Sequence, residues 1–443
     1  MKTSTETFEA DLLIHARWVI PVDETRQVLD FYSVAVCGDT IVALMPTADA
    51  KARVNARQIY HLNEHALIPG LVNLHTHAAM SLLRGRADDE PLMQWLGKTI
   101  WPIEQRHVGY DFVRDGSMLA AAEMLSGGIT TCNDMYYYPE ATAEAFVAAG
   151  LRAVLGIIVV NGQTPYAADT QESIGRGLAL RDQLKGEPLV SFALAPHAPY
   201  TVSDTQFESL AGLAAQLDLP VHIHVHETAQ EIADALRQHH ERPLARLARL
   251  GILGPQCIAV HAVHLDAADM ALLQRYGCTV AHCPSSNLKL GNGIAPVAAL
   301  RQMDVNVGLG TDSAASNNRL DLFTEMRLAA LLAKGATGDA ACVPAYDALA
   351  MATINGAVAL GLERQIGSIE TGKKADLCAV SFATPALRPC YDPVSHLVYA
   401  AGREHVSHVW VNGAPCYEQG RGLLQIDNSS PCSVAASWQI RLE

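Results

Sequence analysis

The sequence lacks the features that would place the chain in several special classes of protein. No apolar run reaches the roughly 18 residues that a membrane-spanning helix needs. The N-terminal stretch MKTSTETFEADLLIHA has neither the basic region nor the apolar core of a secretory signal. None of the 10 cysteines forms a CxxC pair or has zinc-knuckle spacing. We therefore expect a soluble, cytoplasmic protein whose thiols are buried and free, with no membrane partner.

Positive charge is also scarce. The chain has 32 Lys and Arg residues against 46 Asp and Glu residues, which gives a formal net charge of −14. An acidic surplus of this kind disfavours a nucleic-acid partner, because the phosphate backbone is a polyanion. The remaining composition is that of a globular protein, with 49% hydrophobic and 18% charged residues. At 443 residues the chain is long enough for a large barrel and a minor domain.

Both ends of the chain have the pattern of strands and turns. Residues 9–64 alternate apolar and polar side chains in short runs, with Cys37-Gly38-Asp39 as a hairpin turn. The same pattern returns from about residue 364, where GSIETGKKADLCAVSF, HLVYA and VSHVWVNGAPCY are expected to be strands. We predict that residues 1–65 and 364–443 pair into one small β-sandwich beside the rest of the protein.

The central zone, residues 66–363, has a different pattern. Eight short apolar runs alternate with helical stretches such as DFVRDGSMLAAAEMLSGG and TQFESLAGLAAQLDL. The runs are LVNLHTH (71–77), GITTCNDM (128–135), RAVLGIIVV (152–160), VSFALAPH (190–197), PVHIHVHE (220–227), CIAVHAVH (257–264), TVAHCP (279–284) and NVGLGTDS (306–313). Alternating strands and helices imply a parallel sheet, and eight units imply a closed TIM-like (β/α)8 barrel rather than an open, doubly wound sheet.

Polar residues gather where these strands end, which is where such barrels hold their active sites. The first run ends in His75-Thr76-His77, and residues two apart on a strand point to the same face, so the two imidazoles can share a metal ion. The fifth run contains His222, His224 and His226. These three share one parity, so spacing alone does not decide which of them joins the pair.

Other strand ends add to this pattern. Glu227 follows the fifth run, His261 and His264 end the sixth, His282 ends the seventh, and Asp312 ends the eighth. A lone histidine on a strand is more often a hydrogen-bonded core residue than a ligand. The joint placement of histidines and carboxylates at one barrel mouth nevertheless indicates a divalent metal site.

The motifs LIPGLVNLHTH, HIHVHET, AVHAVH, HCPSSNLKLGNGIAP and GLGTDSAASNN together resemble the amidohydrolase superfamily. The most similar branch is that of the 5-methylthioadenosine and S-adenosylhomocysteine deaminases, and the resemblance covers about residues 10 to 420. It implies a metal-dependent aminohydrolase that is a homo-oligomer, either a dimer or a tetramer. Because the fourth run ends in ALAPHAPY without the lysine that bridges two metals in binuclear relatives, one metal ion is expected.

The resemblance also assigns roles to single residues. It makes His75, His77, His224 and Asp312 the metal ligands, Glu227 the proton shuttle and His261 the residue that orients the reactive water. It places Glu104 of WPIE, His197 of APHAPY and Trp95 of QWL, together with Glu227 and Asp312, against the substrate. His222, His226, His264 and His282 are left to packing or to support of the ligands. Without the resemblance, Glu104 would be read as a charge on a helix surface.

The resemblance thus implies hydrolytic deamination of an adenine ring by a water that the metal activates, giving the inosine analogue and ammonia. The ion is expected to be Zn²⁺, with Fe²⁺ or Mn²⁺ as alternatives. Residues 155–173 contain no basic side chain to bind the carboxylate of S-adenosylhomocysteine, which favours 5′-methylthioadenosine over that substrate and adenosine.

Two other functions remain open at this point. One is another deaminase or dechlorinase of the superfamily that acts on guanine, cytosine or an s-triazine. The other is a non-catalytic scaffold protein. Every expected metal-ligand position is filled, which argues against the scaffold.

Overall fold

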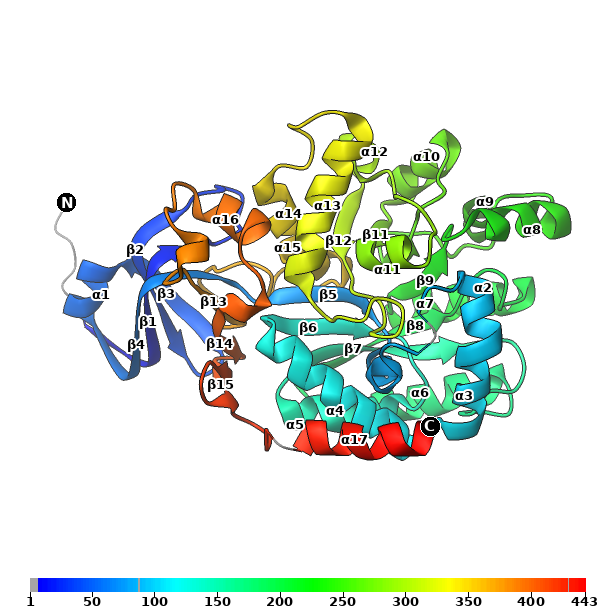
Figure 1. Ribbon diagram of the computed structural model, residues 1–443, viewed down its shortest axis with the longest axis horizontal. Coiled ribbons are helices and arrows are strands. Elements are labelled where there is room, and N and C mark those ends of the chain that lie inside the picture. Colours follow the sequence, from blue (N-terminus) through cyan, green and yellow to red (C-terminus); the bar gives the residue numbers. More distant parts are fainter. Residues whose placement is uncertain (1–6, 87, 429) are drawn as a thin grey trace.

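The computed structural model describes residues 7–86, 88–428 and 430–443, and it contains two eight-stranded sheets with helices around one of them (Figure 1). Residues 1–6 of the N-terminal stretch discussed above lie outside the described residues. No helix in the described part of the chain is both long and apolar enough to cross a membrane.

One sheet is a parallel barrel in which neighbouring strands follow one another in the sequence. Its strands are β5 (Leu71–Thr76), β6 (Ile129–Asp134), β7 (Arg152–Val159), β8 (Val190–Pro196), β9 (Val221–Val225), β10 (Cys257–His261), β11 (Thr279–His282) and β12 (Asn306–Leu309). The two ends of this sheet meet at the mouth, where the backbone N–H of Asp312 donates to the carbonyl of His75 over 3.0 Å. The predicted (β/α)8 barrel is confirmed.

All eight predicted runs form strands, and each strand ends before its run does. The backbone leaves the strand pattern at polar residues that adopt positive φ, including His226 (56°), His261 (69°) and Asp312 (57°). Positive φ is uncommon outside glycine, and such conformations cluster at functional sites. The candidate residues His77, Glu227 and Asp312 therefore lie on turns just beyond β5, β9 and β12 rather than within them.

Helices surround the barrel and bury apolar side chains against its strands (Figure 1). They are α4 (Tyr110–Ser126), α5 (Pro139–Ala149), α6 (Thr170–Gln183), α7 (Asp204–Leu217), α8 (Ala229–His239), α9 (Pro243–Arg249), α10 (Ala267–Tyr276), α11 (Pro284–Lys289), α12 (Val297–Gln302), α13 (Leu322–Thr337), α14 (Ala345–Met351) and α15 (Ile354–Ala359). The two helical stretches singled out in the sequence are α4 and α7. A capping box between Ser203 and Gln206 starts α7.

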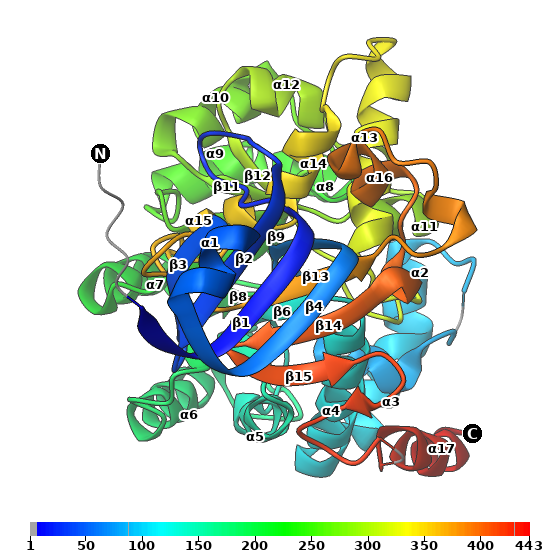
Figure 2. The same cartoon turned by 90° about the vertical axis from the view of Figure 1, so that its left-hand side faces the viewer.

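The second sheet, called the small sheet because it forms the minor part of the molecule outside the barrel, is built from both ends of the chain, as predicted (Figure 2). Its members are β1 (Phe8–Val19), β2 (Leu29–Cys37), β3 (Thr40–Pro46), β4 (Val54–Pro69), β13 (Leu377–Ser381), β14 (Val406–Val411), β15 (Ala414–Glu418) and β16 (Gly422–Leu423), with the short helix α1 (Thr47–Arg53) after β3. The ends join where β4 pairs antiparallel with β13. Gly38 and Asp39 form the hairpin turn between β2 and β3. The domain boundaries stay a prediction, since β4 runs through residue 65 without a break.

One predicted strand is wrong. The stretch HLVYA lies in α16 (Pro393–Tyr399), which begins at Asp392, whose carboxylate accepts hydrogen bonds from the backbone N–H groups of Val394 and Ser395. Pro393 occupies the first helical position, where its missing N–H costs nothing. Val394, Leu397 and Val398 are buried at helical spacing, so the apolar run is the inner face of a helix.

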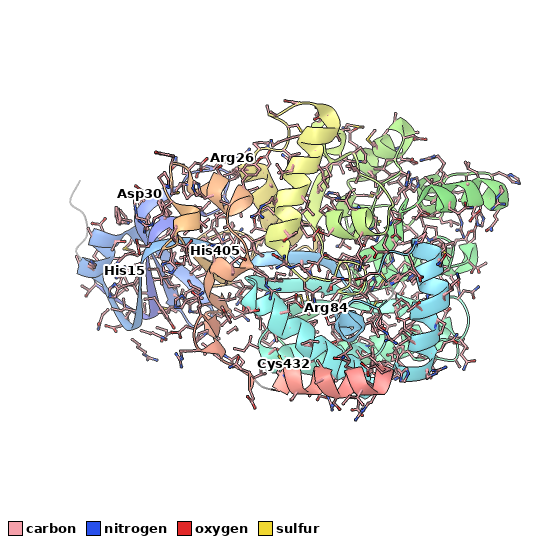
Figure 3. All side chains as sticks on the ribbon, in the orientation of Figure 1. His15, Arg26, Asp30, Arg84, His405 and Cys432 are labelled. Carbon is pink, nitrogen blue, oxygen red and sulfur yellow. The ribbon has the colours of Figure 1, made fainter. Side chains whose placement is uncertain are left out.

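Three further helical regions were not predicted. At the barrel mouth, η1 (Ala78–Leu83) follows β5, and α2 (Leu92–Trp95), the π-helical segment η2 (Leu96–Ile100) and α3 (Trp101–His107) form one continuous helical stretch. At the C-terminus, α17 (Ser430–Leu442) packs along α4 (Figure 1). Cys432 lies exposed on this helix (Figure 3), and it is one of ten free cysteines. The two short turns η3 (Pro385–Leu387) and η4 (Arg403–His405) lie near α16.

Candidate metal centre and active site

Four side chains converge at the mouth of the barrel. The Nε2 atom of His224 lies 3.2 Å from Nε2 of His75 and 3.3 Å from Nε2 of His77. The Oδ1 atom of Asp312 lies 3.2 Å and 3.3 Å from the same two nitrogen atoms. The residues come from three different strand ends, so the barrel itself brings them together.

The spacing of these donor atoms fits a small divalent ion. The four measured separations of 3.2 to 3.3 Å are in the range expected between ligand atoms that each lie about 2.0 Å from one ion, which is the usual length of a Zn–N bond. Three nitrogen donors and one oxygen donor are also the ligand types that zinc and neighbouring transition metals accept. The donor set therefore fits a divalent metal ion.

Each of the three histidines is oriented by a hydrogen bond at its other ring nitrogen. Nδ1 of His77 donates to the carbonyl of Met135 over 2.5 Å, and Nδ1 of His224 donates to the carbonyl of His197 over 2.6 Å. Nδ1 of His75 lies 2.9 Å from Nε2 of His222. Donation through Nδ1 leaves Nε2 unprotonated and directed to the centre, as a metal ligand requires.

Burial keeps these rings neutral. Removal from water lowers the pKa of His75 to about 3 and the pKa of His224 well below its ordinary value. Only a neutral imidazole can bind a metal, so protonation does not compete with metal binding at neutral pH.

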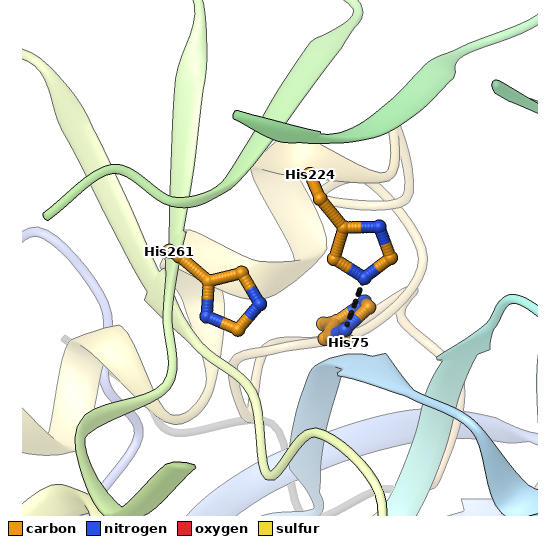
Figure 4. Close-up of side chains that lie close together, drawn as sticks. All are labelled: His75, His224 and His261. Atoms are coloured by element: carbon orange, nitrogen blue, oxygen red, sulfur yellow. Dashed lines mark hydrogen bonds between the residues drawn. The ribbon is translucent and has the colours of Figure 1, made fainter. Parts of the chain in front are cut away.

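His261 and Glu227 lie beside the four converging side chains. Figure 4 shows His261 next to His75 and His224, and the rings of His224 and His261 are stacked with centroids 5.5 Å apart. Oε1 of Glu227 is 3.8 Å from Nε2 of His261. Burial raises the pKa of Glu227 above its usual range, which suits a carboxyl group that must both accept and release a proton.

These groups open into a pocket at the mouth of the barrel, where apolar and aromatic side chains surround a few polar groups, as in sites for small molecules. Its walls include all the expected substrate contacts, namely Trp95, Glu104, His197, Glu227 and Asp312. Trp95 and Glu104 reach it from the helical stretch α2–η2–α3. Among the described residues that line the pocket there is no Arg or Lys.

Sequence reasoning missed Tyr136, which lies just beyond β6. Its hydroxyl donates to Oε1 of Glu104 over 2.7 Å inside the pocket. Burial raises the pKa of Glu104 to about 7, and the hydrogen bond from Tyr136 opposes that rise. The only signal in the sequence was the aromatic run Tyr136-Tyr137-Tyr138 after the second strand, which alone does not reveal a partner on a helix 32 positions earlier.

The other four candidate histidines lie outside the pocket lining. Nε2 of His222 lies 2.9 Å from Nδ1 of His75. His226 accepts a hydrogen bond at Nε2 from the backbone N–H of Leu244 over 3.1 Å. His264 donates from Nε2 to the carbonyl of Asn292 over 2.8 Å. His282 is fully buried near β12, where burial lowers its pKa to about 3.

Comparison with known proteins gives consistent matches. The amidohydrolase family model matches residues 66–416. The 5-methylthioadenosine/S-adenosylhomocysteine deaminase of Teredinibacter turnerae is 45% identical over 438 residues, which cover 99% of each chain. The protein of the same name from Saccharophagus degradans is 43% identical over 439 residues, covering 99% of this chain and 98% of that one.

Solved structures show the same fold. The crystal structure of an adenosine deaminase from Xanthomonas campestris with bound zinc has a TM-score of 0.97 and 46% sequence identity, over 98% of this chain and 99% of that chain. Atrazine chlorohydrolase from Arthrobacter aurescens, solved with zinc, has a TM-score of 0.89 over 96% of this chain and 99% of its own. Its identity is only 24%, so it supports the fold alone.

Proposed function

The chain belongs to the amidohydrolase family, and from that premise we propose that it deaminates the adenine ring of 5′-methylthioadenosine by hydrolysis, giving the inosine analogue and ammonia. One observation carries the proposal, namely the convergence of His75, His77, His224 and Asp312 beside the buried Glu227 in a pocket. The names of the relatives from T. turnerae and S. degradans support the adenosine-type substrate.

The metal of this family is divalent, and we propose that His75, His77, His224 and Asp312 hold one Zn²⁺ ion. When bound, a divalent ion supplies Lewis acidity and lowers the pKa of water from about 16 toward about 7. The zinc in the X. campestris structure supports this choice of metal. Fe²⁺ and Mn²⁺ remain the alternatives, because imidazole and carboxylate ligands accept them as well.

Three side chains act on the water and its protons in the proposed reaction. Deamination adds the oxygen of water to C6 of the ring, and N1 must be protonated so that no charge builds up there. In our proposal Glu227 takes a proton from the attacking water, passes it to N1, and then helps to protonate the leaving amine. Asp312 takes the second proton from the oxygen and releases it, with the help of Glu227, to the leaving amine, and His261 orients the water through Nε2. Ammonia leaves as the C6 carbonyl forms.

The sugar would lie against Glu104. An ionised carboxylate can accept hydrogen bonds from both hydroxyls of a vicinal diol, as in ribose. Tyr136 holds one oxygen of this carboxylate in place. His197 and Trp95 would contact the rest of the nucleoside, since both line the same pocket.

The far end of the pocket suits a neutral group. Leu92, Leu96 and Ile100 lie on the wall beside Trp95 and Glu104, and the described lining offers no cation to an α-carboxylate. Binding of a zwitterionic amino-acid tail normally needs an Arg in bidentate contact. We therefore propose that 5′-methylthioadenosine is preferred over S-adenosylhomocysteine and adenosine.

A comparison of kcat/KM across substrates tests this proposal. The panel contains 5′-methylthioadenosine, S-adenosylhomocysteine, adenosine, guanine, cytosine and an s-triazine, with ammonia release as the readout. We expect the first compound to give the highest value. Turnover of guanine, cytosine or the triazine without turnover of any adenosine would replace our proposal with another activity of the superfamily. The homo-oligomeric state and the cytoplasmic location stay predictions from the sequence.

A further inference from the structure

The motif HCPSSNLKLGNGIAP has no assigned part in the proposed reaction. It forms the end of β11, the helix α11 and the loop after it, at the mouth of the barrel. Three of its side chains reach three residues that handle protons in the proposed reaction. Ser286 donates from Oγ to Oδ2 of Asp312 over 2.6 Å. Asn287 accepts at Oδ1 from Nδ1 of His261 over 2.8 Å.

The third contact is made by Asn292, whose Nδ2 donates to Oε1 of Glu227 over 2.9 Å. Ser286, Asn287 and Asn292 are 0%, 1% and 7% exposed, so water does not compete for these hydrogen bonds. One short segment therefore contacts Asp312, His261 and Glu227, which come from three different strand ends.

The segment is itself held in one conformation. The backbone N–H of Asn292 donates to the carbonyl of Asn287 over 2.8 Å, and its carbonyl accepts from Nε2 of His264 over 2.8 Å. Gly291 and Gly293 on either side have φ of +69° and +119°, which side-chain-bearing residues rarely adopt. A tight turn fixed at both ends leaves the amide of Asn292 little freedom to move.

The chemistry of each contact determines what its partner presents to the substrate. An amide N–H held on Oε1 of Glu227 leaves Oε2 of that carboxylate available to the water and to the ring. An amide oxygen on Nδ1 of His261 holds the proton on that nitrogen and turns an unprotonated Nε2 toward the site. Reacting groups must lie within a fraction of an ångström of the productive geometry, because a displacement of about 1 Å can lower the rate about 100-fold.

We propose that Asn292 and Asn287 are positioning residues, which act on the reaction by orienting Glu227 and His261. The segment 286–292 thereby positions Glu227 and His261, which are not proposed metal ligands, relative to the residues that are. This inference rests on the proposed function for the roles of Glu227 and His261.

A double-mutant cycle tests the inference. Asn292→Ala should lower kcat about 10- to 100-fold and leave KM within about threefold, because substrate binding does not use this amide. In the Glu227→Gln background the same substitution should lower kcat by less than about threefold, because its effect passes through a carboxylate that is no longer there. Likewise, Asn287→Ala should lower kcat in the wild-type protein, and it should lower kcat by less than about threefold in the His261→Ala background.

Two further variants keep the test sharp. Asn292→Asp preserves the size of the side chain and removes the donor, so it should lower kcat as Asn292→Ala does, and it replaces that variant if the latter does not fold. Leu288→Ala is the matched control, because Leu288 is 41% exposed on α11 next to Asn287 and is not among the described residues that line the pocket. It should leave kcat and KM within about twofold of the wild type.

The outcomes separate the inference from the proposed function. The positioning role would be overturned if the effects of Asn292→Ala and Glu227→Gln on kcat were fully additive. It would also be overturned if Asn292→Ala changed KM alone. The cycle is run with whichever substrate of the panel the wild type turns over. Lack of activity on adenosine derivatives would therefore overturn the proposed substrate and still leave the positioning role open to measurement.

Discussion

At the scale of single residues, the site depends on which nitrogen of each ring carries the proton. His75, His77 and His224 each use Nδ1 for a buried hydrogen bond, so three Nε2 atoms point to one centre. Glu227 lies beside these three histidines and is not one of the proposed metal ligands. The proposed function divides these side chains into three histidines that hold the ion and a carboxyl group that moves protons.

Glu227→Gln tests that division. The amide has the same size but cannot shuttle a proton, so kcat should fall by about 10²- to 10⁴-fold. The metal content of the purified variant, measured by atomic emission, should equal that of the wild type. Loss of the metal together with activity would show that Glu227 is needed to build the centre, and near-full activity would show that it is not the shuttle.

Glu104 gives a pH-dependent prediction. Burial raises its pKa to about 7, so the carboxyl group is ionised above that pH and protonated below it. A protonated carboxyl group loses part of its capacity to accept hydrogen bonds from the ribose, and KM should rise as the pH falls through about 7. Glu104→Gln should give a high KM that does not change in this range.

Tyr136→Phe refines the same measurement. The hydrogen bond from Tyr136 lowers the pKa of Glu104, so its loss should move the rise in KM to a higher pH while kcat at high pH changes little. An unchanged KM profile would contradict the contact that the structure shows.

The sequence predicted which side chains meet at the barrel mouth better than it predicted their surroundings. His75, His77 and Asp312 stood out because they follow predicted strands at one end of the barrel. Spacing alone left His222, His224 and His226 open, since all three share one parity and only the three-dimensional register separates them. The contact between Glu104 and Tyr136 joins a helix to a strand end, which no local pattern records.

At the scale of elements, the pocket wall depends on helices that the sequence pattern did not predict. Trp438 and Leu442 of α17 belong to the same apolar cluster as Leu92, Trp95 and Ile100 of the wall. The side chain of Arg86 donates to the carbonyl of Leu442 over 3.0 Å, while the indole of Trp95 donates to the carbonyl of Arg86 over 3.3 Å. The C-terminal helix is thus connected to the pocket.

Trp438→Ala tests this connection. Trp438 is 7% exposed and its indole donates to Asp115, so its removal should lower the free energy of unfolding by about 3 kcal/mol. KM should rise as the wall loosens. Ile440→Ala, at a residue 77% exposed on the same helix, should change stability by less than about 0.5 kcal/mol. Denaturant unfolding and steady-state kinetics on both variants measure the difference.

The helices α16 and α17 also show where reading by pattern fails. A run of five residues such as HLVYA is too short to separate a strand from the buried face of a helix. The N-cap at Asp392 and Pro393 at the first helical position favour a helix over a strand here. By contrast, all eight barrel strands were found, because each is an apolar run flanked by helical stretches.

At the scale of the whole molecule, a buried ion pair joins the barrel to the small sheet. Arg152 at the start of β7 donates to both oxygens of Asp376, just before β13, over 2.9 Å and 3.1 Å. Both side chains are almost fully buried. A charge left unpaired at this depth is costly, so this contact stabilises the position of the small sheet against the barrel.

Arg152→Ala should therefore lower the free energy of unfolding by about 3 to 5 kcal/mol. Arg421→Ala serves as the control, because its ion pair with Glu418 lies at the surface and should contribute less than about 1 kcal/mol. Thermal unfolding of the two variants compares them directly. Equal stability of both would mean that the buried pair does not hold the two parts together.

The central claim is that one divalent ion held by this chain activates water for attack on an adenine ring. It is tested most directly by following conversion of 5′-methylthioadenosine to its inosine analogue before chelation, after chelation, and after return of Zn²⁺. We predict that activity disappears with the metal and returns in full at one ion per chain. Undiminished turnover by the metal-free protein, or no deaminated product from the zinc-loaded protein, would contradict the account.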